Sequence, residues 1–377
     1  MAIVATVLCS CGDLGGNSPA SLSLPTISVR NWSGLFHQEG FPSSGWHSFS
    51  GISVNTQMVG LAPRRIVVSQ YPDALNGWHQ SVDVINPLNG SDKLLLRLPV
   101  EHEAAALAMN AKWFIYEDAL ASNGTYRSLV ARNFMTGRSH TIFKLPLGTF
   151  SAGAVSGLTI HDGTAFWLAN LVTPEGLIGR VYSFDLATGR LRIRLSTSDT
   201  TQHRLFLAMS SSARGLWISV AQPSKNPQGP GGALWYWSYR AKIVTRHIPV
   251  WHPPTLLYGA DATVVLFSSN PQRPPSSLAN PGPYPVYALD FGSKRMDQLT
   301  NAVNPGGSAS LYQSWVAVNS VQDGSVLLNL NTRTRYMFAW PQAAVGGGWL
   351  VLRSADGLLW HTLPRAAMLA PGHPATR

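Results

Sequence analysis

Seven short apolar runs recur along this chain about every fifty residues, and most of them begin with tryptophan. Each run is followed by a polar loop and usually by a second strand-like run that ends in a tight turn. Repeats of this length and composition are typical of small β-sheets arranged around an axis, a β-propeller. The seven runs are 66–68, 113–115, 167–169, 217–219, 264–266, 315–317 and 349–351.

Each repeat reads as a four-stranded antiparallel sheet, with the apolar run as its buried second strand. In one repeat, residues 181–186 fit the third strand, 187–190 the turn and 191–195 the fourth. Gly or Asn is expected to supply the positive φ of such turns. The sequence therefore predicts an all-β fold, a propeller of seven blades, with six or eight as alternatives.

The last repeat is too short to form an outer strand. A segment near the amino terminus, either 24–30 or 47–54, is expected to complete it. Pairing the two ends of the chain in this way removes exposed sheet edges.

Charged residues make up only 12% of the chain, about half the usual share, and the net charge is +10. The Arg residues are spread along the sequence, and Arg64-Arg65 is the densest cluster. No stretch has the pattern of a basic groove with interleaved aromatic residues, so a nucleic-acid partner is not expected. Acidic polymers or lipid headgroups suit a diffuse positive surface better.

Both cysteines lie within the first eleven residues, after an apolar stretch. Leu8-Cys9-Ser10-Cys11 resembles the lipobox of bacterial lipoproteins, but no Lys or Arg precedes the apolar stretch, which is also short for a signal peptide. The resemblance implies that Cys11 is lipidated, that residues 1–21 are signal and tether, and that 22–377 form one exported propeller domain. Membrane contact would then occur only through the anchor, on the outward face of the cell membrane. The alternative is an amino-terminal strand whose cysteines are buried or form a redox or metal pair.

The repeats are similar to those of bacterial propellers of the quinoprotein-like and YVTN-type group. Residues 183–189 follow most of the quinoprotein docking motif A-x-D-x-x-T-G-x-x-x-W, but Ile193 stands where Trp belongs. No other repeat matches well. A quinone or any other cofactor is therefore not expected.

Ligand sites of propellers usually lie on the rim formed by the loops between second and third strands and between blades. Aromatic and imidazole side chains in these loops offer flat faces to a partner protein or a sugar ring. Structural caps over the blades would explain them equally well. The candidate ligand-binding residues are Tyr71, Trp78, Trp251, His252 and Tyr284.

Four histidines from different rim loops, with carboxylates nearby, are candidate ligands of a divalent metal: His79, His102, His203 and His252. No H-x-H or H-E-x-x-H spacing brings two of them together, so separate exposed residues are the alternative. No G-x-S-x-G nucleophile motif is present.

Two functions remain open from the sequence. The first is a surface-anchored, non-catalytic, monomeric propeller that binds a protein or polysaccharide through its rim. The second is a secreted carbohydrate lyase or hydrolase with a metal or carboxylate site. Convergence of three of the four histidines beside a carboxylate would favour the enzyme.

Overall fold

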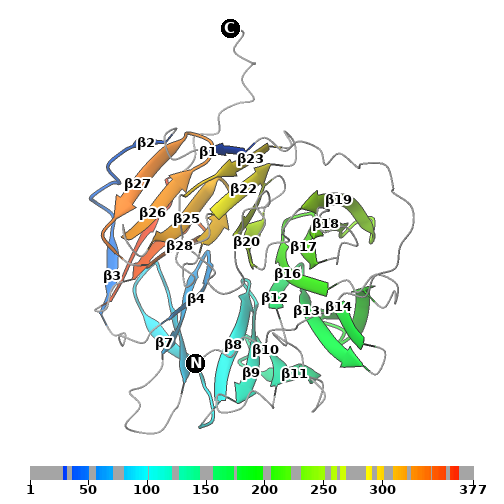
Figure 1. Ribbon diagram of the computed structural model, residues 1–377. Helices are drawn as coiled ribbons and strands as arrows, with labels where there is room; N and C mark the ends of the chain where they lie inside the picture. The colour runs from blue at the N-terminus through cyan, green and yellow to red at the C-terminus, as the bar shows by residue number, and fades with distance from the viewer. Residues whose placement is uncertain are drawn as a thin grey trace.

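The computed structural model shows an all-β ring of seven sheets (Figure 1). Among the residues that it describes there are strands and turns and no helix. It describes residues 29–31, 36–50, 57–70, 80–100, 102–120, 127–144, 156–173, 176–197, 205–221, 231–250, 256–260, 264–268, 286–290, 295–300, 309–320, 324–340, 342–353 and 357–364.

Blades 1–4 each contain four consecutive antiparallel strands. Blade 1 has β4 (Gln57–Ala62), β5 (Arg65–Gln70), β6 (Ser81–Ile85) and β7 (Asp92–Arg97); blade 2 has β8 (His102–Met109), β9 (Trp113–Leu120), β10 (Arg127–Asn133) and β11 (Ser139–Lys144). Blade 3 has β12 (Ser156–His161), β13 (Thr164–Thr173), β14 (Gly176–Asp185) and β15 (Leu191–Ser196); blade 4 has β16 (Leu205–Ser211), β17 (Gly215–Ala221), β18 (Gly232–Ser238) and β19 (Val244–Val250).

Blades 5–7 use the rest of the chain and three short amino-terminal strands. Blade 5 has β20 (Leu256–Ala260), β21 (Val264–Ser268), β22 (Val286–Asp290) and β23 (Arg295–Gln298); blade 6 has β24 (Ala309–Tyr312), β25 (Trp315–Ser320), β26 (Gly324–Asn329) and β27 (Thr334–Phe338). Blade 7 has β28 (Gln342–Gly346), β29 (Trp349–Arg353) and β30 (Leu358–Thr362); the amino-terminal strands are β1 (Val29–Asn31), β2 (His37–Gln38) and β3 (His47–Phe49).

The ring closes as the sequence predicted, because β3 pairs antiparallel with β30 and becomes the outer strand of blade 7. Two further pairings were not predicted. β1 adds in parallel to the outer edge of β23, and β2 adds in parallel to the outer edge of β27. The amino-terminal segment thus links the outer edges of three successive blades, 5, 6 and 7.

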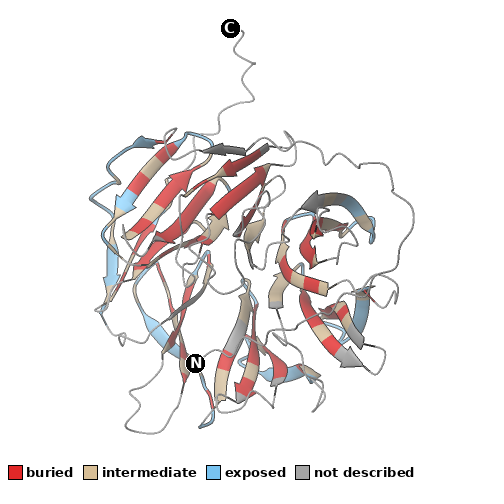
Figure 2. Cartoon of the chain, in the orientation of Figure 1, coloured by how far each residue is buried: buried red, intermediate tan, exposed pale blue. Residues whose placement is uncertain are grey.

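The seven innermost strands contact one another in order, including β28 with β4, so the ring is continuous. The predicted apolar runs lie in the second strand of every blade and are almost wholly buried (Figure 2). Their side chains alternate between the two neighbouring blades. Trp235 and Trp237 both face the cluster shared with blade 3, whereas Tyr236 faces the cluster shared with blade 5.

Five blades turn between the third and fourth strands in one way, closed by a backbone hydrogen bond from residue i+4 to residue i. Glycine has positive φ at the last position in blades 1–3, as predicted, but Lys242 and Arg333 take that conformation in blades 4 and 6. The expectation of Gly or Asn was therefore wrong in those two turns. The bonds are Gly90–Asn86, Gly137–Asn133, Gly189–Asp185 and Lys242–Ser238 at 2.8 Å, and Arg333–Asn329 at 2.9 Å.

Candidate functional site

The two sides of the ring carry different connections. The links between second and third strands and between blades leave one side, which we call the loop rim. The turns between first and second strands and between third and fourth strands lie on the other side, the turn rim.

Of the predicted site residues, the structure describes only His102, at the loop-rim end of β8. The others lie outside the described residues: Cys11, Tyr71, Trp78, His79, His203, Trp251, His252 and Tyr284. Their roles stay predictions. No group of three or more His, Cys, Asp or Glu side chains that could hold a metal ion occurs in the described parts of the chain.

His102 is fixed by Asp118 on the neighbouring strand β9. Its Nδ1 lies 2.6 Å from the Asp118 carboxylate, and both side chains are largely buried. Asp118 stands opposite Ala104 in the sheet register, which places it diagonal to His102 on one face. The carboxylate therefore sets the orientation of the imidazole ring, as it does in many acid–base and ligand-binding sites.

Tyr116 lies on the same strand as Asp118, deeper in the junction between blades 1 and 2. Burial, together with the negative charge of Asp118, raises the pKa of its phenol to about 12. Tyr116 is therefore neutral at physiological pH.

Amide side chains join neighbouring blades on the loop rim. The Gln80 Oε1 atom accepts a hydrogen bond of 2.6 Å from the backbone nitrogen of Ala104, and its Nε2 donates to Ser69 Oγ. Asn319 accepts a bond of 2.6 Å from Ala343 in the same way between blades 6 and 7. The Gln80 bond thus ties blade 1 to blade 2 beside His102.

Four carboxylates gather in the loop-rim halves of blades 1 and 2: Asp83, Glu103, Glu117 and Asp118. We call them the acidic sector. Asp83 accepts hydrogen bonds from Gln70 at 2.8 Å and Ser81 at 3.3 Å, and Glu117 is buried. The exposed cations Arg97 and Lys144 lie at the same end of these two blades, on the outer strands β7 and β11.

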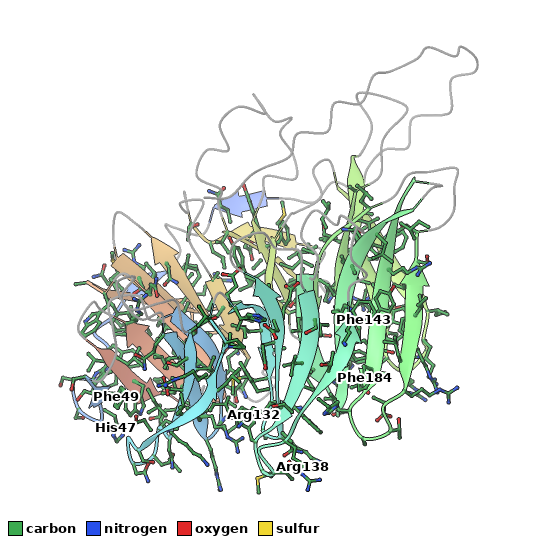
Figure 3. All side chains as sticks on the ribbon, turned by 90° about the horizontal axis from the view of Figure 1, so that it is seen from below. His47, Phe49, Arg132, Arg138, Phe143 and Phe184 are labelled. Carbon is green, nitrogen blue, oxygen red and sulfur yellow. The ribbon has the colours of Figure 1, made fainter. Side chains whose placement is uncertain are left out.

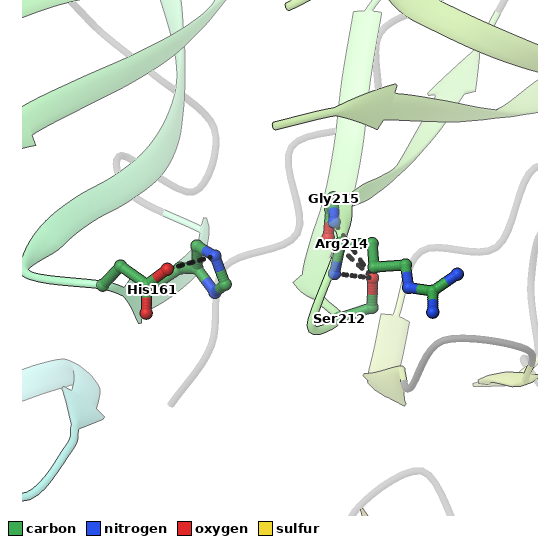
Figure 4. A network of polar contacts seen from close by, with 5 residues as sticks. His161, Ser212, Arg214 and Gly215 are labelled. Carbon is green, nitrogen blue, oxygen red and sulfur yellow. Dashed lines mark hydrogen bonds and ion pairs between the residues drawn. The ribbon is translucent and has the colours of Figure 1, made fainter. Parts of the chain in front are cut away.

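A second polar cluster lies on the turn rim, between blades 3 and 4 (Figure 4). His161 contacts Asp162 at 3.1 Å and stacks on Tyr239, with ring centroids 4.0 Å apart. The Tyr239 hydroxyl is buried and has no hydrogen-bond partner among the described residues, and burial raises its pKa. Sequence analysis missed this cluster because His161 and Tyr239 lie in different repeats and share no local motif.

Among the comparisons with known proteins, only the one with solved structures found similar proteins. No protein-family model matches the sequence, and no curated protein matches it. Among solved structures, the chain resembles the β-propeller domain of the Trilobed protease from Pyrococcus furiosus, with a TM-score of 0.54 and 10% identity over 81% of this chain and 91% of that one. It also resembles an oligogalacturonate lyase from Vibrio parahaemolyticus, with a TM-score of 0.51 and 9% identity over 85% and 97% of the two chains.

A third similar structure is the Pan2 WD40 domain of Neurospora crassa, with a TM-score of 0.50 and 11% identity over 86% and 98% of the chains. These proteins share the propeller fold with this chain. The Pyrococcus domain has an open velcro topology, whereas here β3 pairs with β30. In the described part of the chain, no helix is long and apolar enough to cross a membrane.

Proposed function

We propose that this protein is an exported, non-catalytic binding scaffold that holds a partner on the loop rim of blades 1 and 2. The observation that carries the proposal is the position of three carboxylates of the acidic sector, Asp83, Glu103 and Asp118, on rigid strands at the loop rim. Groups fixed before binding lose little entropy when a partner arrives, so they favour recognition.

The chemistry of the sector selects the partner. Carboxylates attract Lys and Arg side chains and repel acidic polysaccharides. The loop 71–79, which carries Tyr71 and Trp78, joins the strands that hold Gln70 and Asp83. A basic segment of a partner protein is therefore the preferred ligand, and a neutral glycan stacked on these aromatic rings is the alternative.

Peptide and glycan arrays test this proposal with the full chain carrying Cys11→Ala. We expect retention of basic peptides, and a loss of at least about tenfold in the triple variant Asp83→Asn/Glu103→Gln/Asp118→Asn. A matched control, Asp92→Asn/Asp162→Asn/Asp185→Asn, removes the same charge near the turn rim and should bind normally. Equal binding by the two variants would overturn the proposal, and selective binding of neutral glycans would replace the protein partner.

The proposed anchor at Cys11 has its own test. The wild-type chain, expressed in a bacterium, should enter the membrane fraction with an acyl mass on its amino-terminal cysteine. The Cys11→Ala variant should lack that mass. A soluble, unmodified wild-type protein would contradict the anchor and leave the binding scaffold untouched.

A carbohydrate lyase or hydrolase is the second candidate. The His102–Asp118 pair favours it, because a carboxylate-oriented imidazole is a suitable general base. One similar structure is an oligogalacturonate lyase. Release of shortened oligogalacturonates in the presence of divalent cations, abolished by His102→Gln, would support this candidate, and no release by the wild-type protein would exclude it for this substrate.

A further inference from the structure

Basic side chains gather on the turn rim of blades 1–4. They are dispersed in the sequence, but each occupies a turn at the same end of its sheet. Figure 3 shows Arg138 at that end of blade 2. The exposed cations of these turns are Arg64, Lys112, Arg138, Arg190, Arg214, Arg240 and Lys242.

The same turns expose aliphatic side chains, one at each third-to-fourth-strand turn of blades 1–4. Leu88 is 62% exposed, Met135 78%, Leu191 43% and Ile243 61%. One such side chain at each of four neighbouring turns places aliphatic groups along the same rim as the cations. None of the exposed large apolar residues in the described part of the chain is aromatic.

The turns hold these side chains outward. In blades 1–3 an Asn or Asp accepts hydrogen bonds from the backbone of its own turn; for example, Asn133 Oδ1 accepts from Met135 N at 2.8 Å. The polar groups of the turn are thereby satisfied internally, and the tip presents the aliphatic and basic side chains.

Few carboxylates oppose the cations. Asp162 contacts His161, and Asp185 accepts hydrogen bonds of 2.9 Å from Ala187 N and Thr188 N. Asp92 is the remaining described carboxylate beside these turns. The turn rim of blades 1–4 is therefore positively charged.

From these observations we infer that the turn rim of blades 1–4 docks directly on an anionic phospholipid surface. Cations contact the phosphate groups, and the aliphatic tips enter the region between headgroups. A site for single-stranded nucleic acid would instead pair the cations with stacking aromatic rings. This contact is additional to the proposed lipid anchor and independent of the partner on the loop rim.

Vesicle sedimentation with the full chain carrying Cys11→Ala tests the inference, because no acyl group is then present. We expect binding to phosphatidylcholine vesicles that contain about one third phosphatidylglycerol, and little binding to pure phosphatidylcholine. Raising the salt from about 0.1 to about 0.5 M should weaken binding strongly. Arg138→Glu/Arg190→Glu should lower the partition coefficient about twentyfold or more, since each cation contributes about fivefold.

Arg97→Glu/Lys144→Glu is the matched control. Both residues are exposed, but they stand opposite Ser81 and Ser128 at the loop-rim ends of β7 and β11. This variant should bind nearly as well as the parent. Equal losses in the two double variants, or equal binding to both vesicle types, would overturn the inference.

Met135→Asn/Ile243→Asn separates a membrane from a nucleic acid. It leaves the charge unchanged, so we expect weaker vesicle binding and no change in any retention of duplex DNA. Unchanged vesicle binding, together with DNA binding that Arg138→Glu/Arg190→Glu abolishes, would reassign the surface to nucleic acid. Thermal melts that match the parent establish that each variant is folded; if a charge variant does not fold, the salt series and the aliphatic variant still decide.

Discussion

Trp360 in blade 7 donates a hydrogen bond of 2.8 Å from its indole nitrogen to the carbonyl oxygen of Pro87 in blade 1. Trp349 makes the equivalent bond to Pro63, at 3.0 Å. These two bonds cross the junction at which the end of the ring meets its beginning. Blade 7 is therefore joined to blade 1 by directional contacts as well as by apolar packing.

Trp360→Phe tests the first of these bonds. Trp360 and Trp167 are both fully buried, but Trp167 Nε1 has no partner among the described residues. Because only Trp360→Phe removes a formed hydrogen bond, it should cost about 1–2 kcal/mol more unfolding free energy than Trp167→Phe. Urea denaturation measures both. A smaller cost for Trp360→Phe would show that the bond contributes nothing to closure.

Phe41 holds the amino-terminal segment on blades 6 and 7. Its ring lies 5.2 Å from Tyr336, 5.5 Å from Phe338 and 5.1 Å from His361. Phe41→Ala should destabilise the fold by about 2–3 kcal/mol, and limited proteolysis should cleave the amino-terminal segment faster. Phe41→Leu, which keeps most of the apolar volume, should restore much of both. Wild-type stability in Phe41→Ala would show that closure depends on the β3–β30 pairing alone.

Gly157 allows two inner strands to approach each other. Its φ is +61°, and a Cβ atom there would lie 2.5 Å from Met209 Cβ and from the Met209 carbonyl oxygen. Gly189 has a similar φ but open space around it. Gly189→Ala should cost about 1 kcal/mol, and Gly157→Ala clearly more, about 3 kcal/mol. Thermal unfolding of both variants checks the difference, and equal costs would contradict the close approach.

Because of Tyr116, we expect the unfolding free energy to fall as the pH becomes alkaline. Its pKa is raised to about 12 by burial and by Asp118, above the ordinary value of 10.0. The folded state therefore favours the neutral phenol, and this contribution is complete below pH 10 and is lost as the pH rises towards 12. The unfolding free energy should fall more between those pH values in the wild-type protein than in Tyr116→Phe. Urea denaturation of both proteins at a series of pH values measures this difference. If the unfolding free energy falls equally with pH in both, the raised pKa of Tyr116 is contradicted.

The fold could be predicted because each second strand carries a dense apolar run that only a buried strand accommodates. The edge strands β1 and β2 could not be predicted. They contain only three and two residues, too few to show an alternation of apolar and polar side chains, and their partner strands lie far along the chain. The turn prediction failed at Lys242 and Arg333, where a rigid five-residue turn imposes positive φ on a side-chain-bearing residue.

The site was only partly accessible to sequence reasoning. His102 was identified as a rim residue, but its partner Asp118 emerged only from the strand register. The arginines that look scattered in the sequence recur at similar positions of successive repeats, as Arg138 and Arg190 do. An alignment of the seven repeats with one another would have shown that basic residues recur at the same turn, whereas a search for local clusters of charge does not show it.

The pairing of the amino-terminal strands with blades 5, 6 and 7 has a consequence for biosynthesis. β3 must wait for β30, which leaves the ribosome about 300 residues later, tens of seconds at ordinary elongation rates. During most of that interval none of the partners of β1, β2 and β3 has been made, because the first of them, β23, begins at residue 295. The circular architecture can therefore be completed only after β30 has been made.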